Sequence, residues 1–192
     1  MQFMGHMRGG LAAGAAAVAL GGVSGAISLD DSALRQMLYS PFASPDFYTL
    51  GGMFLTAVFM ALFPDIDTPS IPQRWFLRAM AAVLVGLAWQ GRMDLFAVVT
   101  LATLAPMLDH HRGWTHSLAT PWVLSAVLAV VWEYFRAKEA WLSGFSWANV
   151  GRMLQDDWMY VVAAVMGHYT HLLLDLPALR FVPFLRNEPD HH

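Results

Sequence analysis

Most of the histidines and several aspartates of this sequence gather in four short motifs, although the chain around these motifs is apolar. The motifs are a histidine close to the N-terminus, PDID, HHRGWTHS and GHYTHLLLD. They hold the candidate metal ligands His6, Asp65, Asp67, His111, His116, His171 and Asp175, together with Arg112. Two further histidines, His110 and His168, lie beside these residues as candidate outer partners. Imidazole nitrogens and carboxylate oxygens are the donors that suit zinc and manganese. The motifs therefore predict a metal centre.

In the last motif, His168, His171 and Asp175 are spaced at i, i+3 and i+7. Residues three and four apart are neighbours on a helix, so all three share one face. An imidazole and a carboxylate placed in this way can hold one metal ion. Ionisable groups within a membrane helix are costly, and for that reason they indicate function. The alternative is that His171 and Asp175 hydrogen-bond each other or cap a helix end.

The PDID motif places Asp65 and Asp67 two residues apart beside a proline, and their oxygens can bind or bridge cations. The alternative is a turn that ends a helix, since Asp and Pro both favour turns. His6 is the weakest single signal, because one histidine near a terminus is often only a surface residue.

The HRGWTHS motif places His111 and His116 five residues apart around a glycine that permits a tight bend. Thr115 or Ser117 can cap the helix that follows. Arg112 suits bidentate binding of an anion such as phosphate, and it equally suits a lipid headgroup at the membrane surface.

The donor set is larger than one zinc site needs, because a catalytic zinc commonly takes three protein ligands and a water. We therefore expect two or more divalent ions, zinc first and manganese second. Such centres activate water for in-line displacement at phosphorus. The predicted chemistry is hydrolysis of a phosphoester, with Asp65 or Asp67 orienting the attacking water and Arg112 holding the anion.

The composition indicates a bilayer as the solvent. Of the 192 residues, 57% are hydrophobic and 13% are charged, against about 25% charged in an average soluble domain. The net charge of −3 and the lack of a basic run argue against a nucleic-acid partner. Cysteine is absent, which excludes a disulfide framework or a thiolate metal site. We expect one membrane-embedded domain over residues 1–192.

Apolar segments alternate with short polar turns. The expected spans are 11–29, 47–63, 116–135 and 158–179, and two shorter apolar runs cover 76–90 and 95–108. The shorter runs fall below the ~20 residues that cross a bilayer, so they either span together, dip into the membrane or lie at its surface. The first run is long enough to be a span instead of the apolar part of a signal peptide. The fold class is all-α, a polytopic membrane bundle of about four to six membrane helices.

The order of the spans places all four motifs on one side. We count membrane crossings from the side that holds His6. The chain has made, or is completing, an even number of crossings at each later motif. This holds whether the two short runs both cross the membrane or both dip into it. The polar residues therefore converge at one membrane face. Six arginines fall on that side and five basic residues on the other, which favours a cytoplasmic site.

His6 ahead of the first span, then LFPDID, HRGWTHS and GHYTHLLLD in that order, resemble the YdjM-like family of LexA-regulated, membrane-bound, metal-dependent hydrolases of the bacterial inner membrane. The resemblance runs from about His6 to Asp175. The resemblance implies that the family's motif residues correspond in this chain to His6, Asp65, Asp67, His111, Arg112, Gly113, Thr115, His116, Ser117, His171 and Asp175. His110 stands where the family often has glycine, and His168 where tyrosine is common.

The family pattern is also distantly similar to the helical zinc-dependent phospholipase C and P1 nuclease group, which favours a lipid or amphiphilic phosphoester as substrate. Two other hypotheses stay open. One is a non-catalytic membrane protein with a structural metal, whose coordination would be closed. The other is a metal or ion transporter, whose site would lie near the bilayer midplane. The sequence leaves the oligomeric state open.

Overall fold

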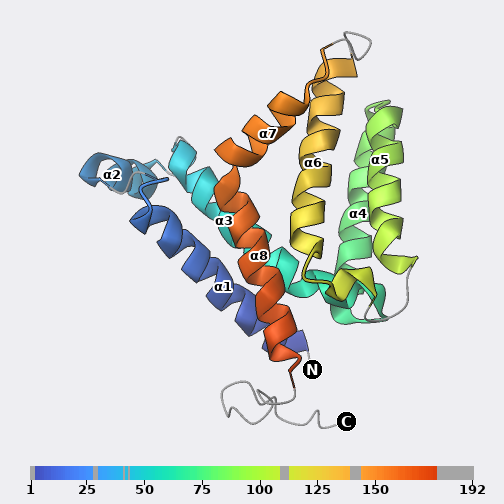
Figure 1. The fold of residues 1–192 in the computed structure, drawn as a ribbon, viewed down its shortest axis with the longest axis horizontal. Coiled ribbons are helices and arrows are strands. Elements are labelled where there is room, and N and C mark those ends of the chain that lie inside the picture. Colours follow the sequence, from blue (N-terminus) through green and yellow to red (C-terminus); the bar gives the residue numbers. More distant parts are fainter. Residues whose placement is uncertain are drawn as a thin grey trace.

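The described part of the protein is helical. The structure is a computed structural model that describes residues 3–27, 30–40, 42, 44–108, 113–138 and 144–176. These residues form eight α-helices, joined by turns and 3-10 segments and without a strand among them (Figure 1). The helices are α1 (Phe3–Val23), α2 (Asp31–Tyr39), α3 (Pro45–Leu62), α4 (Ile71–Trp89), α5 (Met93–Leu104), α6 (Thr120–Ala137), α7 (Trp147–Asp156) and α8 (Trp158–Leu174). The all-α prediction is confirmed for this part of the chain.

The centre of the fold is the three-helix packing of α1, α3 and α8. Small residues let the backbones approach closely, as is common between membrane helices. A side chain on Gly10 would meet Ala61 and Val58 of α3, and one on Gly167 of α8 would meet the backbone of Ala57. The buried apolar residues between these helices are Ala13, Ala17, Met53, Ala57, Met159 and Ala163, with Ile27 beside them.

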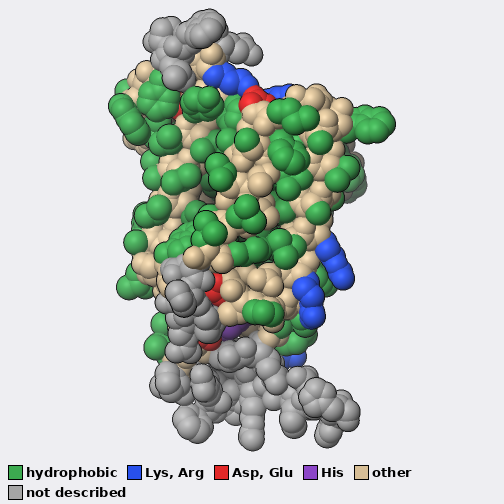
Figure 2. Space-filling model, turned by 90° about the vertical axis from the view of Figure 1, so that its right-hand side faces the viewer, with side chains coloured by type: hydrophobic (Ala, Val, Ile, Leu, Met, Phe, Trp, Pro, Cys, Tyr) green, Lys and Arg blue, Asp and Glu red, His purple; other side chains and the backbone are tan. Residues whose placement is uncertain are grey.

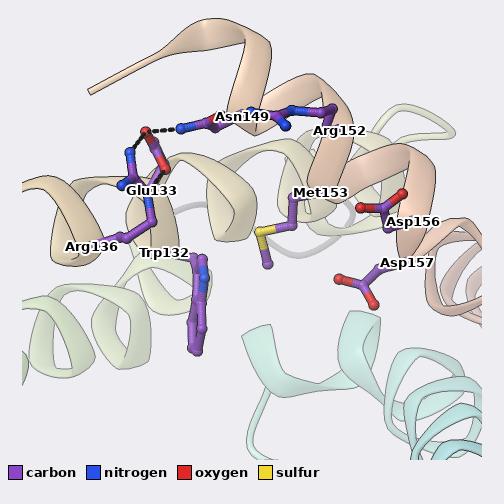
Figure 3. Close-up of a pocket in the computed structure, with 8 residues that line it drawn as sticks. All are labelled: Trp132, Glu133, Arg136, Asn149, Arg152, Met153, Asp156 and Asp157. Atoms are coloured by element: carbon purple, nitrogen blue, oxygen red, sulfur yellow. Dashed lines mark hydrogen bonds and ion pairs between the residues drawn. The ribbon is translucent and has the colours of Figure 1, made fainter. Parts of the chain in front are cut away.

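The helices α4 and α5 form a hairpin whose turn contains Gly91 at a φ of 68°, a conformation that favours glycine. Lys138 at the end of α6 pairs with Asp94 at the start of α5. On α6, the buried carboxylate of Glu133 accepts hydrogen bonds from Arg136 and Asn149 (Figure 3). It also accepts from the Ser146 backbone N–H. These bonds fix α7 against α6 and border a cavity of about 350 Å³.

Hydrophobic side chains cover much of the surface. On the face shown in Figure 2 they occupy the middle, with charged side chains towards the two ends. Within the described ranges, one helical stretch, Asp46–Asp67, is both long and apolar enough to cross a membrane. The apolar stretches Met93–Met107 and Trp158–Leu174 are shorter. The number of membrane helices therefore stays a prediction.

Several helix boundaries differ from those predicted. Helix α1 begins at Phe3, so His6 lies within the helix instead of ahead of it. Helix α4 begins at Ile71 and not at Phe76, because the Ser70 hydroxyl accepts from the Gln73 backbone N–H and caps its N-terminus. The polar connector predicted at 30–46 contains helix α2, capped in the same way by Asp30.

The motif residues also adopt conformations that the sequence did not indicate. The segment predicted as a loop after α3 is a 3-10 helix, η2 (Phe63–Asp67), because Pro64 cannot continue the α-helical bonding. His116 belongs to another 3-10 turn, η4 (Trp114–His116), and α6 begins only at Thr120. Helix α8 ends at Leu174, which places Asp175 at its C-cap.

The close approach of α3 and α8 generates a stability prediction. An added methyl group at Gly167 would lie 2.0 Å from the Ala57 carbonyl oxygen. We expect Gly167→Ala to destabilise the protein by about 1–3 kcal/mol or more, because backbone must move to relieve the clash. The measurement is thermal unfolding in detergent.

Gly51→Ala in α3 is the matched control, because no atom lies within 4 Å of the position of its added methyl group. This substitution should be neutral or stabilising by up to about 1 kcal/mol, since alanine favours a helix over glycine. Equal melting temperatures for the two variants would contradict the packing described here.

Candidate metal centre

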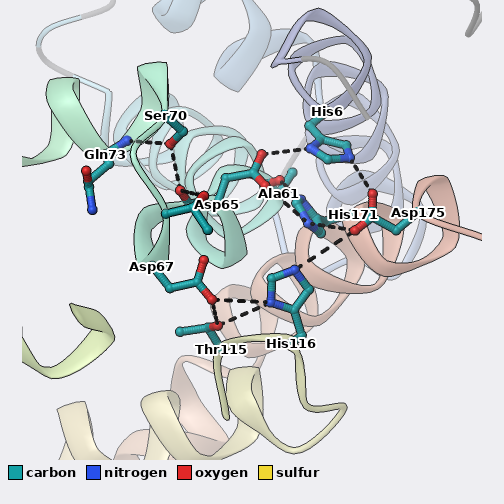
Figure 4. Close-up of polar contacts among 11 residues, drawn as sticks. His6, Ala61, Asp65, Asp67, Ser70, Gln73, Thr115, His116, His171 and Asp175 are labelled. Atoms are coloured by element: carbon teal, nitrogen blue, oxygen red, sulfur yellow. Dashed lines mark hydrogen bonds and ion pairs between the residues drawn. The ribbon is translucent and has the colours of Figure 1, made fainter. Parts of the chain in front are cut away.

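Residues from five segments meet at one end of the bundle (Figure 4). They come from the first turns of α1, the 3-10 helix η2, the turn η4, the last turns of α8 and its C-cap. The side chains brought together are His6, Asp65, Asp67, Thr115, His116, His171 and Asp175. Four motifs that are separated by up to 169 positions therefore form one cluster.

His6 lies between two carboxylates. Its Nδ1 is 2.8 Å from Asp65 Oδ2, and its Nε2 is 3.2 Å from Asp175 Oδ1. His6 is 1% exposed, and its ring packs against the ring of His171 at a tilt of 43°, with 3.9 Å between ring centroids. The histidine that was the weakest signal in the sequence is thus at the centre of the cluster.

His171 is fully buried and has a defined orientation. Its Nδ1 lies 2.8 Å from the Ala61 carbonyl oxygen, which can only accept, so Nδ1 carries the proton. The other nitrogen, Nε2, then presents a lone pair. It has no hydrogen-bond partner among the described residues, and it lies 3.8 Å from Asp65 Oδ1 and 3.7 Å from Asp175 Oδ2.

His116 also lies close to the carboxylate of Asp175. Its Nε2 is 3.9 Å from Asp175 Oδ2, and its Nδ1 is 3.7 Å from Asp67 Oδ2. Asp67 also accepts a hydrogen bond of 2.8 Å from the hydroxyl of Thr115. Asp67 has 0% side-chain exposure, and Thr115 is 1% exposed. Asp67 therefore faces the η4 turn, whereas Asp65 faces His6 and His171.

This arrangement suits a cation. A lone pair on a buried imidazole that faces two carboxylate oxygens is electrostatically unfavourable, and a metal ion between these atoms removes the conflict. Two ligands of a tetrahedral zinc lie about 3.3 Å apart when each is about 2.0–2.1 Å from the ion. The distances of 3.7 and 3.8 Å from His171 Nε2 to the carboxylates are close to that separation. Ligand atoms of His6, His171 and Asp175 all lie within 4.8 Å of one another.

The η2 segment is held by residues that sequence analysis did not identify. The Asp65 carbonyl oxygen accepts from the hydroxyls of Ser70 and Thr68, at 2.6 and 3.3 Å. The side-chain amide of Gln73 donates to the Ile66 carbonyl oxygen at 3.0 Å. The sequence signal was Ser70-x-x-Gln73, a capping-box spacing that marks the start of a helix. The same residues that cap α4 thus fix the backbone that presents Asp65.

His168 is not among the clustered side chains. It is fully buried, and its Nε2 donates to the Ser117 carbonyl oxygen at 3.0 Å. This bond ties α8 to the segment that follows His116. Thr115, which was predicted as a possible helix cap, bonds Asp67 instead. The predicted site residues His111 and Arg112, and the neighbouring His110, lie outside the described residues.

Comparison with protein families gives a match over nearly the whole chain. The family described as YdjM inner membrane protein matches residues 1–186. No curated protein and no solved structure matches the chain.

The different bonding of two buried histidines on α8 generates a prediction. His171→Ala should remove a metal ligand and weaken zinc binding by more than the ~10- to 100-fold that loss of an outer partner costs. His168→Ala should retain bound zinc, although it loses a buried hydrogen bond and about 1–3 kcal/mol of stability. The measurement is zinc content by mass spectrometry of purified protein without an affinity tag, together with the melting temperature. Equal loss of zinc in folded samples of both variants would contradict this assignment.

Proposed function

Because the chain belongs to the YdjM inner membrane protein family, we propose that it is a membrane-bound, metal-dependent hydrolase of a phosphoester in a lipid or amphiphilic substrate. The observation that carries the proposal is the buried Nε2 of His171, which faces the carboxylates of Asp65 and Asp175 without a hydrogen-bond partner in the described part of the chain. His6 and His116 add two imidazoles to the same cluster.

The proposed ligands are His6, Asp65, His111, His116, His171 and Asp175, with Asp67 beside them. A divalent cation held there, zinc first and manganese second, would act as a Lewis acid and lower the pKa of a water molecule. The number of donors favours two ions over one. Cysteine is absent from the chain, so all donors are nitrogen and oxygen atoms.

The chain's own groups supply the rest of the chemistry. Asp65 and Asp175 are 20% and 22% exposed, so solvent reaches the cluster through its carboxylates. This exposure favours an open, catalytic site over a closed structural one. Asp65 is the carboxylate that we assign to orienting the attacking water and accepting its proton. Arg112 is the proposed anion-binding group, because its guanidinium matches two phosphate oxygens.

Membrane embedding gives this site access to amphiphilic substrates. The five longest helices have 17 to 21 residues and therefore rise about 25–32 Å, close to the ~30 Å hydrocarbon core. Exposed tryptophans lie near the two ends of the bundle, with Trp75 and Trp122 near the cluster and Trp89 and Trp158 at the other end. Such aromatic residues are enriched where a helix leaves the bilayer. We propose several crossings, with the site at the cytoplasmic face of the inner membrane.

The position of the cluster also bears on transport. Transporters usually hold their substrates and coupling ions near the middle of the bilayer. The clustered residues lie instead where α1 begins and where α3 and α8 end. Their position at one end of the bundle favours a surface reaction over permeation.

The direct test is hydrolysis by the purified chain reconstituted in lipid bilayers. Phospholipids and other amphiphilic phosphoesters are supplied, and the released phosphate or headgroup is measured with zinc or manganese added and after removal by a chelator. We expect metal-dependent release that falls by at least ~100-fold in Asp65→Asn, because general-base assistance contributes on that order.

Asp31→Asn is the matched control, because Asp31 is an exposed aspartate in the first turn of α2, outside the cluster. It should retain full activity. Hydrolysis that is equally fast in Asp65→Asn, or that survives complete removal of metal, would contradict the proposal.

A further inference from the structure

We propose that Thr115 is a positioning residue that fixes the proton of His116 on Nδ1 and so directs Nε2 towards the metal. The inference rests on the proposed metal centre, but it concerns a hydrogen-bond chain that exists in the protein itself. The chain runs from Asp67 through the Thr115 hydroxyl to His116 Nδ1. It gives Asp67 and Thr115 a role in the centre that is not metal coordination.

The direction of the two hydrogen bonds follows from the number of protons available. An ionised carboxylate only accepts, so the 2.8 Å contact between Thr115 Oγ1 and Asp67 Oδ2 uses the single hydroxyl proton. The Thr115 oxygen can then only accept in its 3.2 Å contact with His116 Nδ1. That contact therefore requires the proton of the neutral imidazole to be on Nδ1, which leaves the lone pair on Nε2.

The geometry places that lone pair in the cluster. His116 Nε2 lies 3.9 Å from Asp175 Oδ2, and Asp175 Oδ2 lies 3.7 Å from His171 Nε2. The two histidines thus present their Nε2 atoms to the same carboxylate oxygen from different segments. In His171 the proton on Nδ1 is fixed by the Ala61 carbonyl oxygen, and in His116 the same task falls to a threonine hydroxyl. A partner that orients a metal-binding histidine in this way is usual around metal sites.

Local structure keeps Thr115 in place. It is the middle residue of the three-residue turn η4, in which the His116 backbone N–H donates to the Gly113 carbonyl oxygen at 3.1 Å. The flanking Trp114 packs edge-on against Phe63 of η2, with 5.9 Å between ring centroids. The turn is therefore attached to the same segment that carries Asp67. The Asp67 side chain has 0% exposure and Thr115 is 1% exposed, which excludes water that would compete for the hydroxyl proton.

The first test is the tautomer of His116 in the metal-free wild-type protein. Protein labelled with 15N-histidine is studied in detergent micelles at a pH where the imidazoles are neutral, and His116 is assigned from the spectrum of His116→Gln. Protonated and unprotonated ring nitrogens have well-separated 15N shifts. We expect Nδ1 to carry the proton. A wild-type His116 with its proton on Nε2 would overturn the proposal without any substitution at Thr115.

The second test compares substitutions of the hydroxyl. Thr115→Val should shift His116 towards the Nε2-protonated form and weaken zinc binding about 10- to 100-fold, the range observed for loss of an outer partner. Thr115→Ser retains the hydroxyl and should restore both properties. Thr103→Val is the folding control, because it removes another buried hydroxyl, one that donates within α5 to the Val99 carbonyl oxygen.

The outcomes separate this inference from the proposed function. An unchanged tautomer or unchanged zinc affinity in folded Thr115→Val overturns the inference, and so does a Thr115→Ser variant that behaves like valine. If Thr115→Val does not fold, Thr115→Ala removes the same hydroxyl without placing a methyl group in its position, and the wild-type tautomer still decides. Wild-type protein that binds zinc but hydrolyses no phosphoester would contradict the proposed function and leave the inference intact.

Discussion

The polar cluster of this protein is built around one buried imidazole, that of His171, and the groups that orient it. The Ala61 carbonyl oxygen takes the Nδ1 proton of His171, and this leaves Nε2 facing two carboxylates inside the protein. Such an arrangement is costly in the low-dielectric interior unless a positive charge lies between the atoms. The position of His171 is set by α3 and α8, and the carboxylates come from η2 and the C-cap of α8. Each of these elements must therefore be in register for the cluster to form.

Close packing of α1, α3 and α8 supplies that register. Gly9 and Gly10 of α1 and Gly167 of α8 allow contacts that a methyl group would prevent. The same close packing brings the ring centroids of His6 and His171 to 3.9 Å from each other. Stability and chemistry are thus linked, because the residues that bring the backbones together also define the distances between the polar groups. Towards the other end of α6, Glu133 joins α6 to α7 through hydrogen bonds from Asn149 and from the Ser146 backbone N–H.

The residues of the cluster could be predicted from the sequence better than the hydrogen bonds between them. The spacing of His171 and Asp175 predicted one shared helix face, and the order of apolar segments predicted that His6 and Asp65 would lie at the same end. These arguments need only helix geometry and a count of crossings. The contact of Thr115 with Asp67 joins residues 48 positions apart and depends on how η4 packs against η2, which no local pattern encodes. The hydrogen bond from His171 Nδ1 to the Ala61 carbonyl oxygen of α3 could not be predicted from the sequence for the same reason.

The most direct test of the metal centre is a crystal structure of the protein with zinc, with anomalous scattering recorded on both sides of the zinc absorption edge. We expect an anomalous peak about 2.0–2.2 Å from His171 Nε2 and from a carboxylate oxygen of Asp175 or Asp65. His6 or His116 should complete the coordination. Absence of a peak in this cluster at saturating zinc, with His171 Nε2 bonded only to protein or water, would contradict the proposed metal centre.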